Sequence, residues 1–197
     1  MYTILDYIDW RGDLSFESSP LCEVDSVILS RLSYIPFDNI VPKSFDTKVT
    51  LKEAADKFLA LPDATRRVYM DEDINLILKM AQSKRFKDLN LCGFINEFDA
   101  ETEKQFCALT INLSDNYHFV SFRGTDNTLV GWKEDFNMSF MSPVPSQEAA
   151  VIYLETAMES LKGNFVVAGH SKGGNLAIYS SAFCHESMQP RIISAYN

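Results

Sequence analysis

Apolar residues recur at helical intervals through the first half of the chain, and prolines interrupt them. Pro36 and Pro62 each end such a run, while Thr50 and Glu53 have the spacing of a capping box at the start of a helix. The pattern therefore predicts a mostly helical N-terminal part over about residues 1–85. Its specific helices are predicted over residues 24–35, 50–62 and 71–82.

The spacing of apolar residues changes in the middle of the chain. Runs rich in Phe, Leu, Ile, Val and Thr are separated by short turn signals of acidic residues, Ser and Asn. These breaks are too short for a crossover helix, so the runs are expected to pair as an antiparallel meander of strands. The strands are predicted over residues 89–99, 104–113 and 117–122.

Helical and strand patterns alternate over the rest of the chain. Strands separated by helices pair in parallel, and such a sheet is buried on both faces. The chain has no internal repeat and no linker-like segment, so one α/β domain with a mixed sheet is predicted over residues 1–197. The expected order is helix 131–140, helix 146–161, strand 165–168, helix 173–184 and strand 191–196.

Composition narrows the class of protein. The chain is 46% hydrophobic and has 27 acidic against 18 basic residues, which gives a net charge of -9. The apolar content excludes a disordered chain, and the acidic charge argues against nucleic acid and anionic membranes as partners. No apolar run is long enough for a membrane span, and the N-terminus lacks a signal-peptide pattern. We therefore expect no stable membrane insertion and a cytoplasmic location.

The short charged groups and the cysteines are not predicted to form binding sites. The basic groups at residues 66–67 and 84–87 are expected to be solvated loops on this acidic protein. The acidic run at residues 71–73 lacks the spacing of a calcium loop. The 4 cysteines contain no C-x-x-C pair, which predicts buried free thiols rather than a metal site or disulfides.

The segment Gly169-His170-Ser171-Lys172-Gly173 lies between an apolar strand and a small-residue helix. Gly-x-Ser-x-Gly in this context is the pattern of a nucleophile elbow. The turn would hold Ser171 in a strained conformation with an exposed hydroxyl, and a side chain at either glycine would collide with neighbouring backbone. Ser171 is therefore the candidate nucleophile, and the Lys172 amide at the helix N-terminus is a candidate oxyanion donor.

A second polar turn follows the last strand of the predicted meander. It has the sequence Phe-Arg-Gly-Thr over residues 122–125, with Trp132 and Asp135 downstream. In a serine hydrolase, one oxyanion amide follows the nucleophile and the other comes from a loop after an earlier strand. Thr125 is the candidate for that second amide, and its hydroxyl would orient or add to the donors.

Together these two segments resemble the class 3 lipase family of α/β hydrolases. In that family a strand-end Phe-Arg-Gly-Thr/Ser, with a downstream Trp and Asp, precedes a Gly-His-Ser-x-Gly-Gly elbow. A closer resemblance is to a bacterial lipase-like family of unassigned function, and it is carried by residues 7–16, residues 29–34 and Lys172. The resemblance spans nearly the whole chain, although secreted fungal members usually have Leu in place of Lys172 and carry a signal peptide and disulfides.

The resemblance implies an α/β-hydrolase fold, a three-layer sandwich whose mixed sheet has a meander and then parallel strands. It also implies ester hydrolysis with Ser171 as the nucleophile and the amides of Thr125 and Lys172 as the oxyanion hole. No metal or organic cofactor is implied. The expected substrate is a small-molecule or lipid ester, and the reaction proceeds through an acyl-enzyme.

The rest of a catalytic triad is not evident in the sequence. α/β hydrolases place Ser, Asp or Glu, and His in that order, but only His185 follows Ser171, at the end of the elbow's own helix. His118 and His170 are interpreted as structural residues. The resemblance puts the acid and the histidine after Asn197, so the chain looks truncated and is expected to be nearly inactive as given.

Several alternatives remain open at this point. Residues 126–131, where lipases of this class carry a lid, are short and polar, so a soluble short-chain ester is as plausible as a lipid. Acyl transfer uses the same serine chemistry with a different acceptor. A noncatalytic α/β-hydrolase domain that binds or regulates is the alternative from another class. A chain that ends inside a sheet would also expose an unpaired edge, which favours homo-oligomers.

Overall fold

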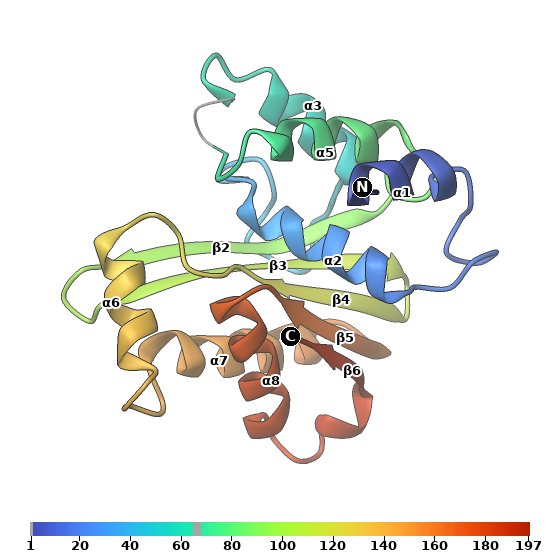
Figure 1. Cartoon of the computed structure of the whole chain (residues 1–197). Helices are drawn as coiled ribbons and strands as arrows, with labels where there is room; N and C mark the ends of the chain where they lie inside the picture. The colour runs from blue at the N-terminus through green and yellow to red at the C-terminus, as the bar shows by residue number, and fades with distance from the viewer. Residues whose placement is uncertain (1, 65–67) are drawn as a thin grey trace.

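A mixed sheet of six strands forms the centre of the protein, in the order β1-β2-β3-β4-β5-β6 (Figure 1). The computed structural model describes residues 2–64 and 68–197. Strands β1 to β4 pair antiparallel, and β5 and β6 continue the sheet in parallel, so the predicted meander followed by parallel strands is confirmed. The strands are β1 (Val49–Thr50), β2 (Asn90–Asp99), β3 (Lys104–Ser114), β4 (Tyr117–Phe122), β5 (Asn164–Gly169) and β6 (Ile192–Tyr196).

Helices cover both faces of this sheet (Figure 1). One buried apolar cluster joins the sheet to the N-terminal helices, and a second joins it to two of the later helices, Pro145–Ser160 and Lys172–Phe183. The first group is α1 (Ile4–Arg11), α2 (Glu23–Arg31) with the 3-10 turn Leu32–Tyr34, α3 (Leu51–Leu59) and α5 (Glu72–Gln82). The later helices are α6 (Leu129–Asn137), α7 (Pro145–Ser160) and α8 (Lys172–Phe183), followed by the 3-10 turn Gln189–Arg191. Among the described residues, no helix is both long enough and apolar enough to cross a membrane.

Local signals place most elements within a few residues of their predicted ends. The Thr50 hydroxyl accepts a hydrogen bond from the Glu53 amide at 3.2 Å, and the Glu53 carboxylate accepts one from the Thr50 amide at 3.1 Å. This capping box fixes the start of α3 as predicted. Helix α1 was not among the predicted helices, because Ile8 is its only buried residue and its apolar stripe is correspondingly weak.

Two predictions about the N-terminal half are wrong in detail. The apolar spacing that predicts the helix over residues 24–35 consists of Val24, Val27, Ile28, Leu32 and Ile35, but Val24 and Val27 are 38% and 53% exposed. Ile28 is buried as this spacing predicts, together with its neighbour Leu29. Cys22 is exposed, whereas the other three cysteines are buried as expected.

The basic segment 84–87 is not a solvated loop, because the Arg85 side chain is buried. Its guanidinium donates to both carboxylate oxygens of Asp25, at 2.7 and 2.5 Å. It also donates to the backbone carbonyls of Leu14 and Ser19, at 3.1 and 3.0 Å. A buried arginine needs such partners, and charge counting along the sequence does not reveal them. The other basic pair, Arg66–Arg67, lies outside the described residues.

Candidate active site

Ser171 occupies the sharp turn between β5 and α8. Its backbone has φ 59° and ψ -126°, a left-handed conformation that is costly for a residue with a side chain. The residue is exposed. The strained turn that the Gly-x-Ser-x-Gly spacing predicts is therefore present, with the serine at the surface.

The two flanking glycines allow three backbone segments to approach one another. A Cβ atom at Gly169 would lie 2.3 Å from the carbonyl carbon and oxygen of Gly173. A Cβ atom at Gly173 would lie 2.2 Å from the carbonyl oxygen of Phe122, at the end of β4. No real side chain tolerates such contacts, so the glycines let β4, β5 and the start of α8 converge behind Ser171.

The loop after β4 lies against the elbow. A Cβ atom built on Gly124 would be 3.4 Å from the Ser171 Cβ and 2.5 Å from the His170 carbonyl oxygen. The Gly124 amide donates to the Tyr34 hydroxyl at 3.1 Å, which makes it unavailable to a substrate. In the next residue, the Thr125 hydroxyl is buried and has no hydrogen-bond partner among the described residues. Thr125 thus has an unpaired buried hydroxyl one residue after the glycine that lies against the elbow.

Lys172 begins α8, so its amide has no acceptor within the helix. Its side chain turns into the protein and is only 2% exposed. The ammonium group donates to a Glu134 carboxylate oxygen at 2.8 Å and to the carbonyl and side-chain oxygens of Gln105 at 2.5 and 2.9 Å. Burial lowers the pKa of Lys172, and the Glu134 carboxylate opposes that shift. The lysine therefore anchors the elbow helix to its neighbours.

Glu134 is a fully buried carboxylate that the sequence analysis missed. It accepts hydrogen bonds from the amide and hydroxyl of Ser146, at 2.8 and 2.7 Å, and from the Gln105 amide at 3.0 Å. The motif that begins at residue 122 includes Trp132 and Asp135 but not Glu134. Trp132 is 63% exposed and Asp135 is half-buried. The signal that points to Glu134 is Lys172 itself, because a buried lysine requires a carboxylate partner.

The three histidines occupy very different environments. His118 is a buried sheet residue as predicted, with ring nitrogens 2.6 Å from Asn112 Oδ1 and 2.8 Å from the Lys162 carbonyl. His185 follows the far end of α8 and contacts Ser187 at 2.8 Å. His170 is exposed rather than packed, and its Nδ1 lies 3.2 Å from the Tyr34 hydroxyl. No hydrogen bond joins a histidine to the Ser171 hydroxyl in the described part of the chain.

Ser171 lies on the wall of a cavity of about 370 Å³. The elbow supplies Gly169, His170 and Ser171, and α2 contributes Val27 and Arg31. A cavity of this size is in the range that binds small ligands. Among the described residues, no three His, Cys, Asp or Glu side chains come together in a way that would hold a metal ion.

The part of the chain that contains Ser171 is similar to a known protein family. The model of the Mbeg1-like family matches residues 80–197, which carry the sheet from β2 onward and the elbow. The chain belongs to the Mbeg1-like family. This is a lipase-like family of unassigned function, so the match supports the lipase-like resemblance in its broader form. No curated protein and no solved structure matches the chain.

The Mbeg1-like match contains Ser171, Thr125, Lys172 and Glu134, but it does not contain every residue at the site. Tyr34 and the α2 residues of the cavity wall come from the segment before residue 80. The N-terminal helices therefore complete a site whose candidate nucleophile lies in the Mbeg1-like region.

Proposed function

We propose that this protein is a serine hydrolase with an α/β-hydrolase fold that cleaves a carboxylic ester through an acyl-enzyme on Ser171. The observation that carries the proposal is the conformation of Ser171, which is strained, exposed and on the wall of a cavity. Strain of this kind persists only where the surrounding structure maintains it, and it is concentrated at functional sites. The class 3 lipase-like assignment is part of the same proposal.

In the proposed reaction the Ser171 hydroxyl oxygen attacks the ester carbonyl carbon, and its proton passes to a general base. The carbonyl oxygen becomes an oxyanion that accepts hydrogen bonds from the amides of Thr125 and Lys172. The bond to the alcohol then breaks, and the alcohol leaves with the proton. Water repeats the sequence on the acyl-enzyme and releases the acid.

Three features support the proposed oxyanion hole. The Lys172 amide is a helix N-terminal donor with no acceptor inside the helix, and the helix dipole favours negative charge there. The Gly124 amide is bonded to Tyr34, which leaves the following amide, that of Thr125, as the donor from this loop. The buried Thr125 hydroxyl, without a partner among the described residues, is available to a developing negative charge.

Fluorophosphonate labelling of the full-length natural protein tests the proposal. We expect one adduct, located by mass spectrometry on the peptide that contains Ser171, and no adduct in a Ser171→Ala variant. Ser114→Ala is the matched control, because Ser114 is an exposed serine at the end of β3. The Ser171 peptide should still be labelled in this variant. Labelling of another residue, or ester turnover by Ser171→Ala at the natural rate, would contradict the proposal.

A noncatalytic binding domain is the second candidate function. It is favoured by one observation: no histidine is hydrogen-bonded to Ser171 among the described residues, and a serine without a base is a weak nucleophile. This candidate predicts that the full-length protein shows no fluorophosphonate adduct while Ser171→Ala still binds ligands as the natural protein does. The same two preparations therefore separate the candidates.

A further inference from the structure

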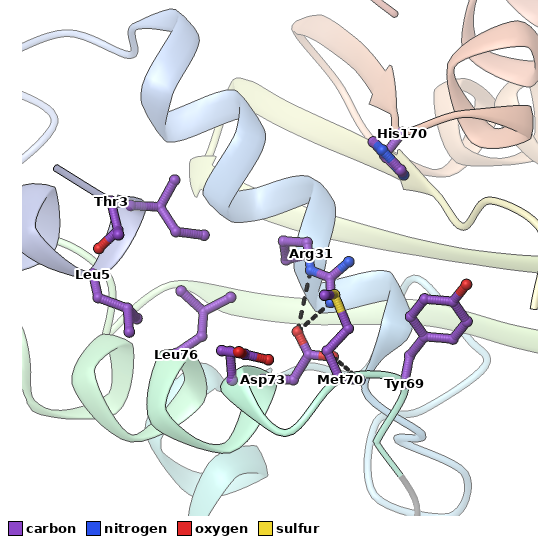
Figure 2. Close-up of a pocket in the computed structure, with 10 residues that line it drawn as sticks. Thr3, Leu5, Arg31, Tyr69, Met70, Asp73, Leu76 and His170 are labelled. Carbon is purple, nitrogen blue, oxygen red and sulfur yellow. Dashed lines mark hydrogen bonds and ion pairs between the residues drawn. The ribbon is translucent and has the colours of Figure 1, made fainter. Parts of the chain in front are cut away.

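A second and larger cavity, of about 640 Å³, lies between α1, α2 and the start of α5 (Figure 2). Figure 2 shows Leu5 and Leu76 on one side of it and Tyr69 on the other. Its apolar wall consists of Ile4, Leu5, Tyr69, Met70 and Leu76. A concave, mostly apolar space of this volume is typical of a small-ligand site.

This cavity adjoins the one that contains Ser171. Arg31 and His170 line both cavities, so these two side chains form the boundary between them. A ligand whose reacting group lies at Ser171 would therefore reach the larger cavity by passing the ring of His170. The elbow itself supplies that ring, since His170 precedes Ser171.

Two of the three charged side chains in the larger cavity, Arg31 and Asp73, form an ion pair. Arg31 donates to a carboxylate oxygen of Asp73 from two nitrogens, at 3.1 and 2.5 Å, and Asp73 also accepts from the Met70 amide at 3.1 Å (Figure 2). The Arg31 guanidinium also lies 4.5 Å from the centre of the Tyr34 ring. A paired arginine gives little attraction to an anion, and the remaining charge on the wall, Glu72, repels one. The cavity is suited to an uncharged apolar group.

We propose that this cavity holds the apolar chain of an ester whose carbonyl group lies at Ser171. The inference rests on the proposed function, and it adds a substrate class: esters with a medium or long hydrocarbon chain. The cavity wall comes from residues before position 80 together with His170, so the N-terminal helices determine how long a chain the protein accepts.

Ligand binding to Ser171→Ala tests this inference without any catalytic step. The probes are methyl butyrate, methyl octanoate and octyl acetate, each titrated by saturation-transfer NMR. We expect at least one octyl-length ester to bind about tenfold or more tightly than methyl butyrate, since each buried methylene group contributes roughly fourfold. Tighter binding of methyl octanoate assigns the cavity to the acyl chain, and tighter binding of octyl acetate assigns it to the alcohol chain.

A matched pair of methionine substitutions locates the binding. Met70 on the cavity wall and Met141 after α6 are both 47% exposed, so tryptophan at either position should be tolerated by the fold. In the Ser171→Ala background, Met70→Trp fills the cavity and should remove the preference for the long chain. Met141→Trp should leave that preference unchanged.

The possible failures are distinguishable. If no octyl-length ester binds more tightly than methyl butyrate, or if Met70→Trp leaves the preference intact, the inference is overturned even when fluorophosphonate labels Ser171 in the full-length protein. If the label is absent but the long esters bind and Met70→Trp weakens them, the cavity assignment stands and the proposed ester hydrolysis fails.

Discussion

At the scale of single residues, Tyr34 connects the two loops that surround Ser171. Its hydroxyl accepts the Gly124 amide at 3.1 Å and lies 3.2 Å from His170 Nδ1, on the elbow. Burial raises the pKa of Tyr34, so the hydroxyl stays protonated at neutral pH and one proton serves as a donor. Among the described residues no hydrogen bond joins Tyr34 to Ser171, so Tyr34 acts as a positioning residue for the two loops.

We predict that Tyr34→Phe slows phosphonylation of Ser171 in the full-length protein by about tenfold, because loops misplaced by a fraction of an ångström stabilise the transition state poorly. The loss should appear in the maximal rate of inactivation rather than in the concentration of fluorophosphonate that gives half of it. Tyr117→Phe is the control, since Tyr117 begins β4 at the opposite end from Gly124. Equal rates for Tyr34→Phe and the natural protein would show that Tyr34 only fills space.

The residues of the site differ in how readily their environment follows from the sequence. The turn at Ser171 follows from local sterics, since glycines two positions away on each side permit the close backbone approaches that this turn requires. The exposure of His170 does not follow from its neighbours in the sequence, because it depends on α2 and the segment before α5. Local rules predict the nucleophile, whereas the cavity beside it depends on contacts between distant segments.

At the scale of elements, the Lys172–Glu134 pair joins the start of α8 to α6. Glu134 also holds the first turn of α7 through Ser146 and the start of β3 through the Gln105 amide. Four elements thus meet at one buried carboxylate, directly behind the elbow. Secondary-structure patterns predict each of these elements separately, but they contain no information about this junction, because hydrophobic periodicity gives no weight to a buried charge.

We predict that Lys172→Met lowers the free energy of unfolding by about 3–5 kcal/mol, because it leaves the Glu134 carboxylate buried without its cation. The double variant with Glu134→Gln should recover part of that loss. Lys104→Met is the matched control: its ion pair with Glu97 is partly exposed and should contribute about 1 kcal/mol or less. Urea unfolding measures all three, and a Lys172→Met cost as small as that of Lys104→Met would contradict the prediction.

At the scale of the whole molecule, the sequence predicts the mixed sheet more completely than the arrangement of its first helical layer. The short links between β2, β3 and β4 allow only antiparallel pairing, and the helical segment between β4 and β5 allows parallel pairing. Arg85 shows the limit of that reasoning. It gathers the backbone of residues 14–20 and Asp25 around one buried guanidinium, and no spacing rule connects those segments.

Buried ionisable groups in the core make the fold less stable at alkaline pH. Cys107 is fully buried in β3, and burial raises the pKa of its thiol from 9.0 to about 11. The unfolded chain therefore loses this proton first as pH rises. The contribution of the neutral thiol to stability is complete below about pH 9 and is lost between about pH 9 and pH 11. Burial likewise raises the pKa of Tyr153 and Cys92, so the natural protein should lose further stability in alkali.

We predict that the natural protein loses about 2 kcal/mol more unfolding free energy than Cys107→Ala does when both are moved from about pH 8 to about pH 10.5. Comparing the two pH dependences cancels the cavity that alanine creates, because that cost is present at both pH values. Val120→Ala is the control, since Val120 is fully buried and has no titratable group, so its pH dependence should match that of the natural protein. Urea unfolding at the two pH values measures these differences. Parallel pH dependences for the natural protein and Cys107→Ala would mean that the thiol ionises as readily in the folded chain as in the unfolded one.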